Sequence, residues 1–139
     1  MERPVVTLTT DFGLNSAYPA QMKGVLLSRV PTVCIIDVTH AIPPHDVASA
    51  GMALLQVARS FPPGTLHLAV VDPGVGSNRD LLLISCEDNL FLAPDNGLLD
   101  ALYSYRRVDN SWRVACSTKR HPDVSPVFHG RDIFAPLAA

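Results

Sequence analysis

Residues 4–10 read PVVTLTT, a stretch rich in β-branched residues and nearly continuous in apolarity. This pattern predicts a strand covered on both faces, as in a parallel sheet. Residues 16–29 follow with apolar side chains at helical spacing, which predicts a helix. Two more buried strands are predicted at residues 33–38 and 65–71, with a second helix between them at residues 45–59.

The alternation of strands and helices predicts the fold class. Strand, helix, strand, helix, strand in this order implies an α/β fold with right-handed crossovers, a parallel sheet and helices on both of its faces. Beyond Asp72 the pattern changes to two short strands with hairpin spacing, a short helix and one more strand. We place these four elements at residues 81–86, 90–93, 97–103 and within 106–117.

Composition sets the class of protein. Of the 139 residues, 47% are hydrophobic and 17% are charged, which supports one compact domain and excludes a disordered chain. The net charge of −2 argues against a nucleic-acid binder that works through a basic face. No apolar run approaches the roughly 20 residues that span a bilayer, and the first residues do not follow the plan of a signal peptide. Because Cys34, Cys86 and Cys116 lack CxxC spacing, we expect buried free thiols in a cytoplasmic protein.

The excess of Asp over Glu indicates that many acidic residues lie in loops and at candidate binding sites. The chain has eleven Asp against two Glu, and Asp favours caps, turns and binding sites. Asp11, Asp37 and Asp72 each lie at or near the end of a predicted parallel strand. Ligands of open parallel sheets bind at the carboxyl ends of the strands. Two interpretations stay open for each Asp: a cap of a helix or loop, or a ligand-binding group.

A glycine-rich segment after the third strand resembles a phosphate loop only at first sight. Residues 74–79 read GVGSNR, so the GxGxxG pattern is incomplete, and a strand rather than a helix follows. We therefore exclude nucleotide phosphate binding there. A turn that returns Arg79 toward Asp72 is the better interpretation.

The five histidines show no HxxxH or HExxH spacing, and no ligand spacing supports a metal site. His67 lies inside a predicted strand and is expected to pack in the core or at an edge. His40 and His45 flank a proline turn and are candidates to cap the second helix. His129 precedes Gly130, a residue that lets the backbone approach a ligand closely.

Seven motifs occur in order and together resemble the S-adenosyl-L-methionine (SAM) hydroxide adenosyltransferases, adenosine-forming SAM hydrolases related to fluorinases and chlorinases. The motifs are TTDFG (residues 9–13), MKG (22–24), DVTH (37–40), FPPGT (61–65), VDPGVG (71–76), APDNGLL (93–99) and FHGRDIFAP (128–136). The resemblance implies that residues 1–139 form a Rossmann-like three-layer N-terminal domain without the family's small β-rich C-terminal domain. The last residues read as a helix that stops without a cap, so the domain is expected to be truncated inside that helix.

The resemblance also implies roles for individual residues. Asp72, Arg79 and His129 match the family's catalytic triad, which handles water or hydroxide. The substrate-binding residues would be Asp11, Phe12, Ser16, Asn96 and Gly130, with Asp11 on the ribose hydroxyls and Ser16, an Asp in some members, near the methionine end. Tyr18-Pro19-Ala20 and Val127 depart from the residues that are commoner in the family. A structural ion pair between Asp72 and Arg79 remains the alternative to a catalytic one.

The implied reaction is hydrolysis of SAM to adenosine and L-methionine by displacement at C5′. SAM would be the substrate, with no other cofactor, metal, nucleic acid or membrane involved, and the full-length protein would be a homotrimer. An anionic Asp72 would repel a halide, which disfavours a SAM-dependent halogenase. Two alternatives stay open: an inactive nucleoside-binding or trimer-forming module and, more weakly supported, a metal-dependent hydrolase.

Overall fold

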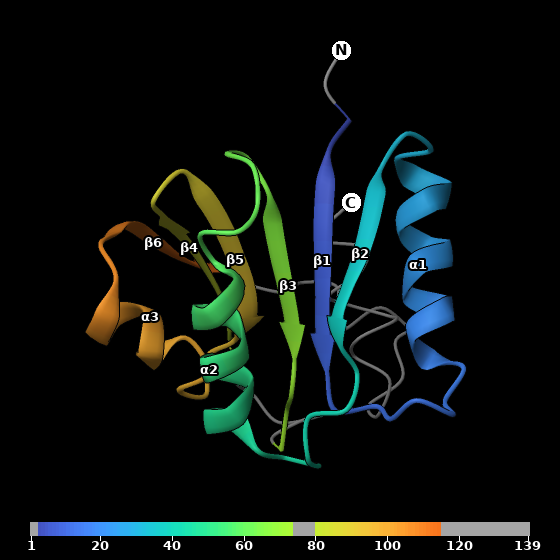
Figure 1. Cartoon of the computed structure of the whole chain (residues 1–139), viewed down its shortest axis with the longest axis horizontal. Coiled ribbons are helices and arrows are strands. Elements are labelled where there is room, and N and C mark those ends of the chain that lie inside the picture. Colours follow the sequence, from blue (N-terminus) through green and yellow to red (C-terminus); the bar gives the residue numbers. More distant parts are fainter. Residues whose placement is uncertain (1–2, 74–79, 115–139) are drawn as a thin grey trace.

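A computed structural model describes residues 3–73 and 80–114, which form an α/β domain around one six-stranded sheet (Figure 1). The strand order is β2-β1-β3-β5-β4-β6. The strands are β1 (Val5–Thr10), β2 (Cys34–Thr39), β3 (Leu66–Val70), β4 (Leu81–Cys86), β5 (Asn89–Pro94) and β6 (Val108–Val114). The predicted fold class is confirmed, and each predicted strand within the described residues is present.

The sheet is parallel on one side and antiparallel on the other. β1 pairs in parallel with β2 and with β3, and β3 pairs in parallel with β5. β4 lies antiparallel between β5 and β6. The predicted hairpin is confirmed, because Glu87 and Asp88 connect β4 to β5 with φ angles of 49° and 68°. Two residues with positive φ give a turn whose twist matches that of the paired strands.

Helices cover both faces of the sheet, as predicted (Figure 1). Helix α1 (Tyr18–Arg29) lies on one face, with α2 (Val47–Val57) and α3 (Asp100–Tyr105) on the other. Alternate residues of the strands point to opposite faces of the sheet and contribute to two apolar clusters. Met22 and Leu26 of α1 pack with residues such as Leu8 and Leu68, while Leu54 and Leu102 pack with residues such as Ile84 and Phe91. The side-chain period of two explains why a single strand supplies both clusters.

The start of α2 corrects one prediction. The N-cap is Asp46, whose Oδ1 accepts a hydrogen bond from the Ser49 amide at 3.0 Å, so neither His40 nor His45 caps this helix. Asp is among the strongest N-cap residues because its short carboxylate reaches the unpaired amides of the first turn. In α1, Pro19 falls in the first turn, where its missing N–H costs nothing.

The remaining core predictions concern His67 and the cysteines. His67 is fully buried, with Nδ1 2.8 Å from the Thr7 hydroxyl oxygen and its ring stacked on Phe91 at 4.6 Å between centroids. Burial lowers the pKa of His67 to about 4, because charging a desolvated imidazole is unfavourable. Cys86 is a buried free thiol as predicted, whereas the free thiol Cys34 is only half-buried. Cys116 lies outside the described residues.

Candidate functional site

The carboxyl ends of β1 and β3 form the point where the direction of chain winding reverses. From β1 the chain passes through α1 to β2 on one side, and from β2 it crosses through α2 to β3 on the other. Thr10 lies opposite Val70 in the β1–β3 pairing, so Asp11 follows this pair directly and Asp72 lies two residues beyond Val70. Open α/β sheets bind ligands in the crevice at such a switch point.

Asp72 is buried at this edge, with a relative exposure of 7%. Its neighbour along the chain is held by Asn96, whose side-chain amide donates to the Val71 carbonyl at 3.0 Å. The Asn96 side-chain oxygen accepts from the Leu98 amide at 3.1 Å. Asn96, a predicted substrate-binding residue, therefore joins the ends of β3 and β5 and fixes the backbone beside Asp72.

Asp11 is half-buried and faces the loop that precedes α2. Its Oδ2 accepts a hydrogen bond from the His45 amide at 2.8 Å. His45 itself has a φ of 63°, an uncommon conformation for a residue with a side chain, so the chain turns sharply at this contact. A carboxylate offers roughly four acceptor sites, so Asp11 keeps the capacity to accept from two hydroxyls. The cap interpretation of Asp11 is thus correct for one oxygen, and a binding role stays compatible with it.

Phe12 and Ser16 shape the approach to α1. The Phe12 ring meets the Tyr18 ring edge-on, with 5.8 Å between centroids. The Ser16 hydroxyl oxygen accepts from the Tyr18 amide at 3.1 Å. Both predicted binding residues therefore lie in the segment between Asp11 and the first turn of α1, and both contact Tyr18.

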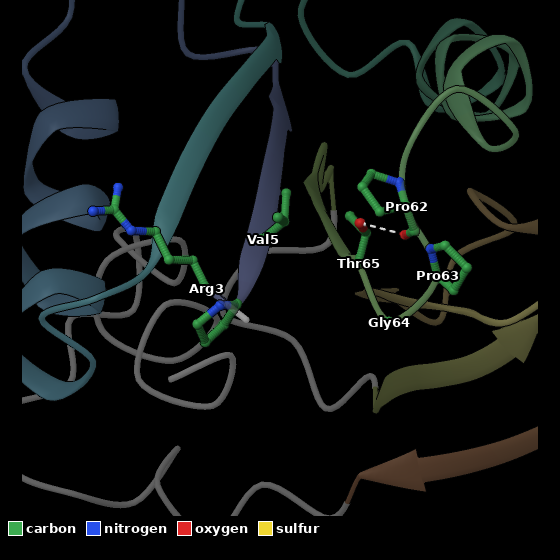
Figure 2. Close-up of a pocket in the computed structure, with 7 residues that line it drawn as sticks. Arg3, Val5, Pro62, Pro63, Gly64 and Thr65 are labelled. Carbon is green, nitrogen blue, oxygen red and sulfur yellow. Dashed lines mark hydrogen bonds between the residues drawn. The ribbon is translucent and has the colours of Figure 1, made fainter. Parts of the chain in front are cut away.

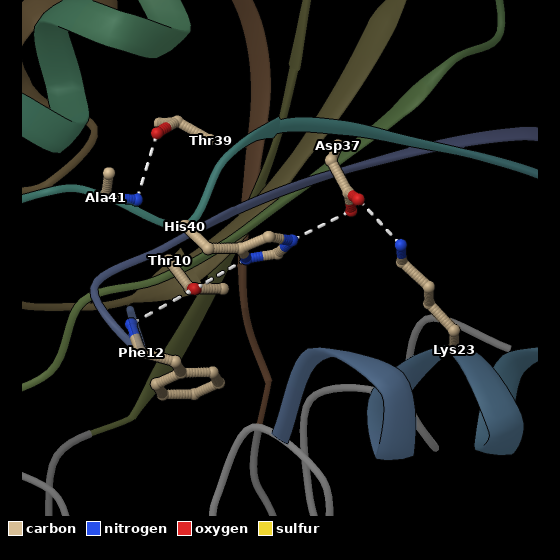
Figure 3. A network of polar contacts seen from close by, with 7 residues as sticks. All are labelled: Thr10, Phe12, Lys23, Asp37, Thr39, His40 and Ala41. Atoms are coloured by element: carbon tan, nitrogen blue, oxygen red, sulfur yellow. Dashed lines mark hydrogen bonds and ion pairs between the residues drawn. The ribbon is translucent and has the colours of Figure 1, made fainter. Parts of the chain in front are cut away.

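A chain of polar side chains that ends on Thr10, the residue before Asp11, is the feature that sequence reasoning missed (Figure 3). Lys23 Nζ donates to Asp37 Oδ2 at 2.6 Å, and His40 Nε2 lies 2.8 Å from Asp37 Oδ1. His40 Nδ1 in turn lies 2.7 Å from Thr10 Oγ1. Burial raises the pKa of Asp37, but the hydrogen bonds and charges of Lys23 and His40 outweigh it, so the pKa lies below its usual value. Asp37 is therefore not a helix cap, and its two oxygens are engaged within the protein.

A pocket at the opposite, amino-terminal edge carries no comparable chemistry (Figure 2). It has a volume of about 580 Å³ and lies between the start of β1 and the segment before β3. Among the described residues that line it, Arg3 is the one with an ionisable side chain, and the Thr65 hydroxyl donates to the Pro62 carbonyl at 2.7 Å. By contrast, the described motif residues Asp11, His40 and Asp72 lie at the carboxyl edge.

Three predicted site residues, Arg79, His129 and Gly130, lie outside the described residues, as does the helix expected from residue 131. In residues 3–73 and 80–114, no group of three or more His, Cys, Asp or Glu side chains is placed to hold a metal ion. The same part of the chain contains no helix with the length and apolarity needed to cross a membrane.

Comparison with known proteins gives the family of this chain. A family model for the SAM hydroxide adenosyltransferase N-terminal domain matches residues 6–139. The chain belongs to this family.

Individual SAM hydroxide adenosyltransferase relatives support the assignment. A (R)-S-adenosyl-L-methionine hydrolase of Salinispora tropica is 45% identical over 137 residues, which cover 98% of this chain and 52% of that protein. The crystal structure of an uncharacterized conserved protein from Thermotoga maritima matches with a TM-score of 0.87 and 37% identity, covering 96% of this chain and 51% of that one. A fluorinase of Nocardia brasiliensis is 24% identical, covering 96% of this chain and 52% of that protein. The chain therefore spans about half the length of the curated relatives it matches.

Proposed function

We propose that this domain belongs to a SAM hydrolase that converts SAM to adenosine and L-methionine. The observation that carries the proposal is the buried carboxylate of Asp72 at the switch point, one strand away from Asp11. The similarity to proteins named (R)-S-adenosyl-L-methionine hydrolase supports the substrate. A halide-binding pocket would be disfavoured beside this carboxylate, because like charges repel strongly where water is excluded.

The proposed step is an in-line displacement at C5′ of the ribose. A bond forms between the water-derived oxygen and C5′ while the bond from C5′ to sulfur breaks, and sulfur keeps the electron pair. Methionine leaves as a neutral thioether, and the proton of the attacking water passes to a base and then to solvent. Because the sulfonium is already a good leaving group, the protein's main task is to hold the nucleophile about 3 Å from C5′ on the face opposite sulfur.

Each predicted residue has a role in this step. Asp72 accepts a hydrogen bond from the nucleophile, Arg79 favours its hydroxide form, and His129 orients or deprotonates it. Asp11 accepts from the two ribose hydroxyls. The rest of the substrate contacts are assigned to Phe12, Ser16, Asn96 and Gly130.

We also propose a cytoplasmic homotrimer for the full-length protein. SAM would lie between this domain of one subunit and the C-terminal domain of the next. The coverage of about half of each relative supports a second domain in the complete enzyme, and the free thiols Cys34 and Cys86 fit a reducing compartment.

The test is turnover of SAM by the purified protein in water enriched in ¹⁸O. We expect equal amounts of adenosine and L-methionine, with ¹⁸O in the 5′-hydroxyl of adenosine. Adenosine without the label would contradict attack by water at C5′. A 5′-halo-5′-deoxyadenosine formed in chloride or fluoride buffer as the only product would instead indicate a halogenase.

A second candidate is a nucleoside-binding or trimer-forming module without activity, in which Asp11 at the end of β1 would bind a ribose without a chemical step. Calorimetric titration with adenosine and with SAM separates the two. Binding of either ligand without release of methionine would support the module, and a trimer that binds neither ligand would support a purely structural role.

A further inference from the structure

His40 connects three elements of the fold immediately behind the Asp11 loop. Through Asp37 it is linked to β2 and to Lys23 of α1, and through Thr10 it is linked to the last residue of β1 (Figure 3). His40 is 8% exposed, whereas the side chains of Lys23 and Asp37 are 34% and 40% exposed. An exposed ion pair contributes little to stability. The buried His40–Thr10 contact is therefore the part of this network that best fixes the position of β1.

A β-bulge aims His40 at Thr10. Leu8 pairs with Asp37 and the next residue, Thr9, pairs with Thr39, so Val38 is an extra residue on β2. In a regular strand, residues three apart point to opposite faces. The bulge interrupts this alternation between Asp37 and His40, which directly follows β2, and the His40 ring contacts both the Asp37 carboxylate and Thr10. Bulges of this kind commonly redirect side chains near functional sites.

Backbone contacts carry this connection into the Asp11 loop. The Gly13 amide donates to the His40 carbonyl at 2.8 Å, and the Phe12 amide donates to Thr10 Oγ1 at 3.3 Å. The His45 amide donates to Asp11 Oδ2, which closes the loop from the other side. Residues 11–13 are thus held at both ends by the segment that contains His40.

The protonation pattern of the ring follows from its partners. Asp37 Oδ1 can only accept, so the His40 Nε2–H donates to it and, in the neutral ring, Nδ1 accepts from the Thr10 hydroxyl. The Thr10 oxygen then remains an acceptor for the Phe12 amide. In the charged ring, Nδ1–H donates to the Thr10 oxygen instead, so both ring contacts are kept in either charge state.

We propose that His40 is a positioning residue that holds Asp11 and Phe12 in the geometry that receives the ribose of the substrate. The inference rests on the proposed function, since Asp11 is the residue assigned to the ribose hydroxyls. His40 acts through the loop and does not touch the substrate. Its loss should therefore weaken a contact that is made equally in the ground state and the transition state, which raises KM more than it lowers kcat.

The kinetic test compares His40→Ala, His40→Asn and a control, Arg59→Ala. Arg59 forms a bidentate ion pair with Glu87 at the opposite edge of the sheet, so the control also removes a charged hydrogen-bonded side chain. We expect His40→Ala to raise KM for SAM at least tenfold with kcat within threefold of wild type. His40→Asn keeps an acceptor near the Nδ1 position and should raise KM less, while Arg59→Ala should leave KM within twofold.

A structural test that needs no turnover is amide hydrogen exchange. In His40→Ala, the amides of Phe12, Gly13 and His45 should exchange at least tenfold faster than in wild type. The amides of Val30 and Ala58, which close α1 and α2 through bonds to Leu26 and Leu54, should not change. The dissociation constant of adenosine, measured by calorimetry, replaces KM if SAM is not hydrolysed.

These measurements separate failure of the inference from failure of the proposed function. Lack of turnover by wild type would refute SAM hydrolysis, while exchange and adenosine affinity still decide the role of His40. Unchanged exchange of the three loop amides would overturn the proposal. So would faster exchange with unchanged KM and adenosine affinity. A fall in kcat at constant KM would show only fewer folded molecules and would also overturn it.

Discussion

The carboxylates at the two edges of the parallel sheet differ in their burial and in their hydrogen-bond partners. At the carboxyl edge, Asp72 is buried and Asp11 is half-buried and held by a backbone amide from a loop 34 residues away in the chain. At the amino edge, Glu87 pairs with Arg59 in a bidentate contact at 2.9 Å, with the Arg59 side chain 67% exposed. The pair at the amino edge is an exposed surface ion pair, which typically contributes little to stability. The difference teaches that burial and backbone support, rather than charge pairing alone, distinguish the candidate site.

The largest effect should follow from removing the buried charge at the carboxyl edge. Asp72→Asn keeps the size of the side chain and loses its ability to accept a proton, so kcat should fall by about 100-fold or more. The measurement is the initial rate of adenosine release, with the unfolding midpoint recorded in parallel. Asp109→Asn, at an exposed position on β6, is the matched control and should keep the wild-type rate. Equal rates for both variants would remove Asp72 from the mechanism.

Asp11→Asn should act on substrate affinity. Hydrogen bonds to a charged acceptor contribute about 1.5–3 kcal/mol, so KM should rise by roughly 10- to 100-fold. Adenosine affinity, which reports the ribose without the methionine, should fall by a similar factor. A fall in kcat at unchanged KM would instead show that Asp11 acts on the chemical step. Its assignment as a ribose-binding residue would then be wrong.

Prediction from the sequence succeeded where a structure depends on nearby residues. Alternating and helical apolar spacing located β1, α1, β2, α2 and β3, and the short gap between residues 86 and 90 located the hairpin. The end of β3 also placed Asp72 correctly, because strand ends can be read from a single apolar run. These features need no knowledge of the rest of the chain.

Prediction failed where a structure depends on contacts between distant segments. The bulge at Val38 reflects a shift in the register between β1 and β2, and no local sequence pattern predicts it. The contact of Asp11 with His45 likewise joins two loops that only the β2–α2 crossover brings together. The motif DVTH was visible, but its function as a support behind Thr10 was not. Asp46 is the cap of α2 in place of the two candidate histidines, as expected of a short carboxylate directly before the helix.

The packing that holds the carboxyl edge can be tested with a pair of glycines. A Cβ at Gly51 of α2 would lie 2.5 Å from the Leu98 carbonyl oxygen, in the turn that Asn96 joins to β3. Gly51→Ala should therefore lower the free energy of unfolding by about 1–3 kcal/mol. A Cβ at Gly24 of α1 would meet nothing within 4 Å, so Gly24→Ala should raise stability by about 0.5–1 kcal/mol. Urea unfolding measures both changes. An unchanged free energy of unfolding in Gly51→Ala would show that the turn containing Leu98 can move to accommodate the added Cβ.

A pH effect should separate stability from substrate binding. The pKa of His67 falls from 6.5 to about 4 on folding, so the unfolded chain binds the proton more readily. The stabilisation is complete above pH 6.5 and is lost as the pH falls from 6.5 toward 4. When the pH is lowered from 7 to 5, protonation linked to His67 should reduce the free energy of unfolding of the wild type by about 2 kcal/mol. His67→Leu should flatten this part of the urea-unfolding profile, and an equally steep profile in the variant would assign the effect to other groups.

The smallest effect is expected at the amino edge. Arg59 holds the pKa of Glu87 below its usual value through their hydrogen bond, but both side chains can exchange this contact for water when it is broken. Arg59→Ala should therefore lower stability less than Gly51→Ala and leave KM and kcat within twofold of wild type. Thermal unfolding and initial rates of the same preparations measure this. A large loss of either quantity would mean that an exposed ion pair can support the domain as strongly as the buried carboxyl edge, and the contrast between the two edges would lose its physical basis.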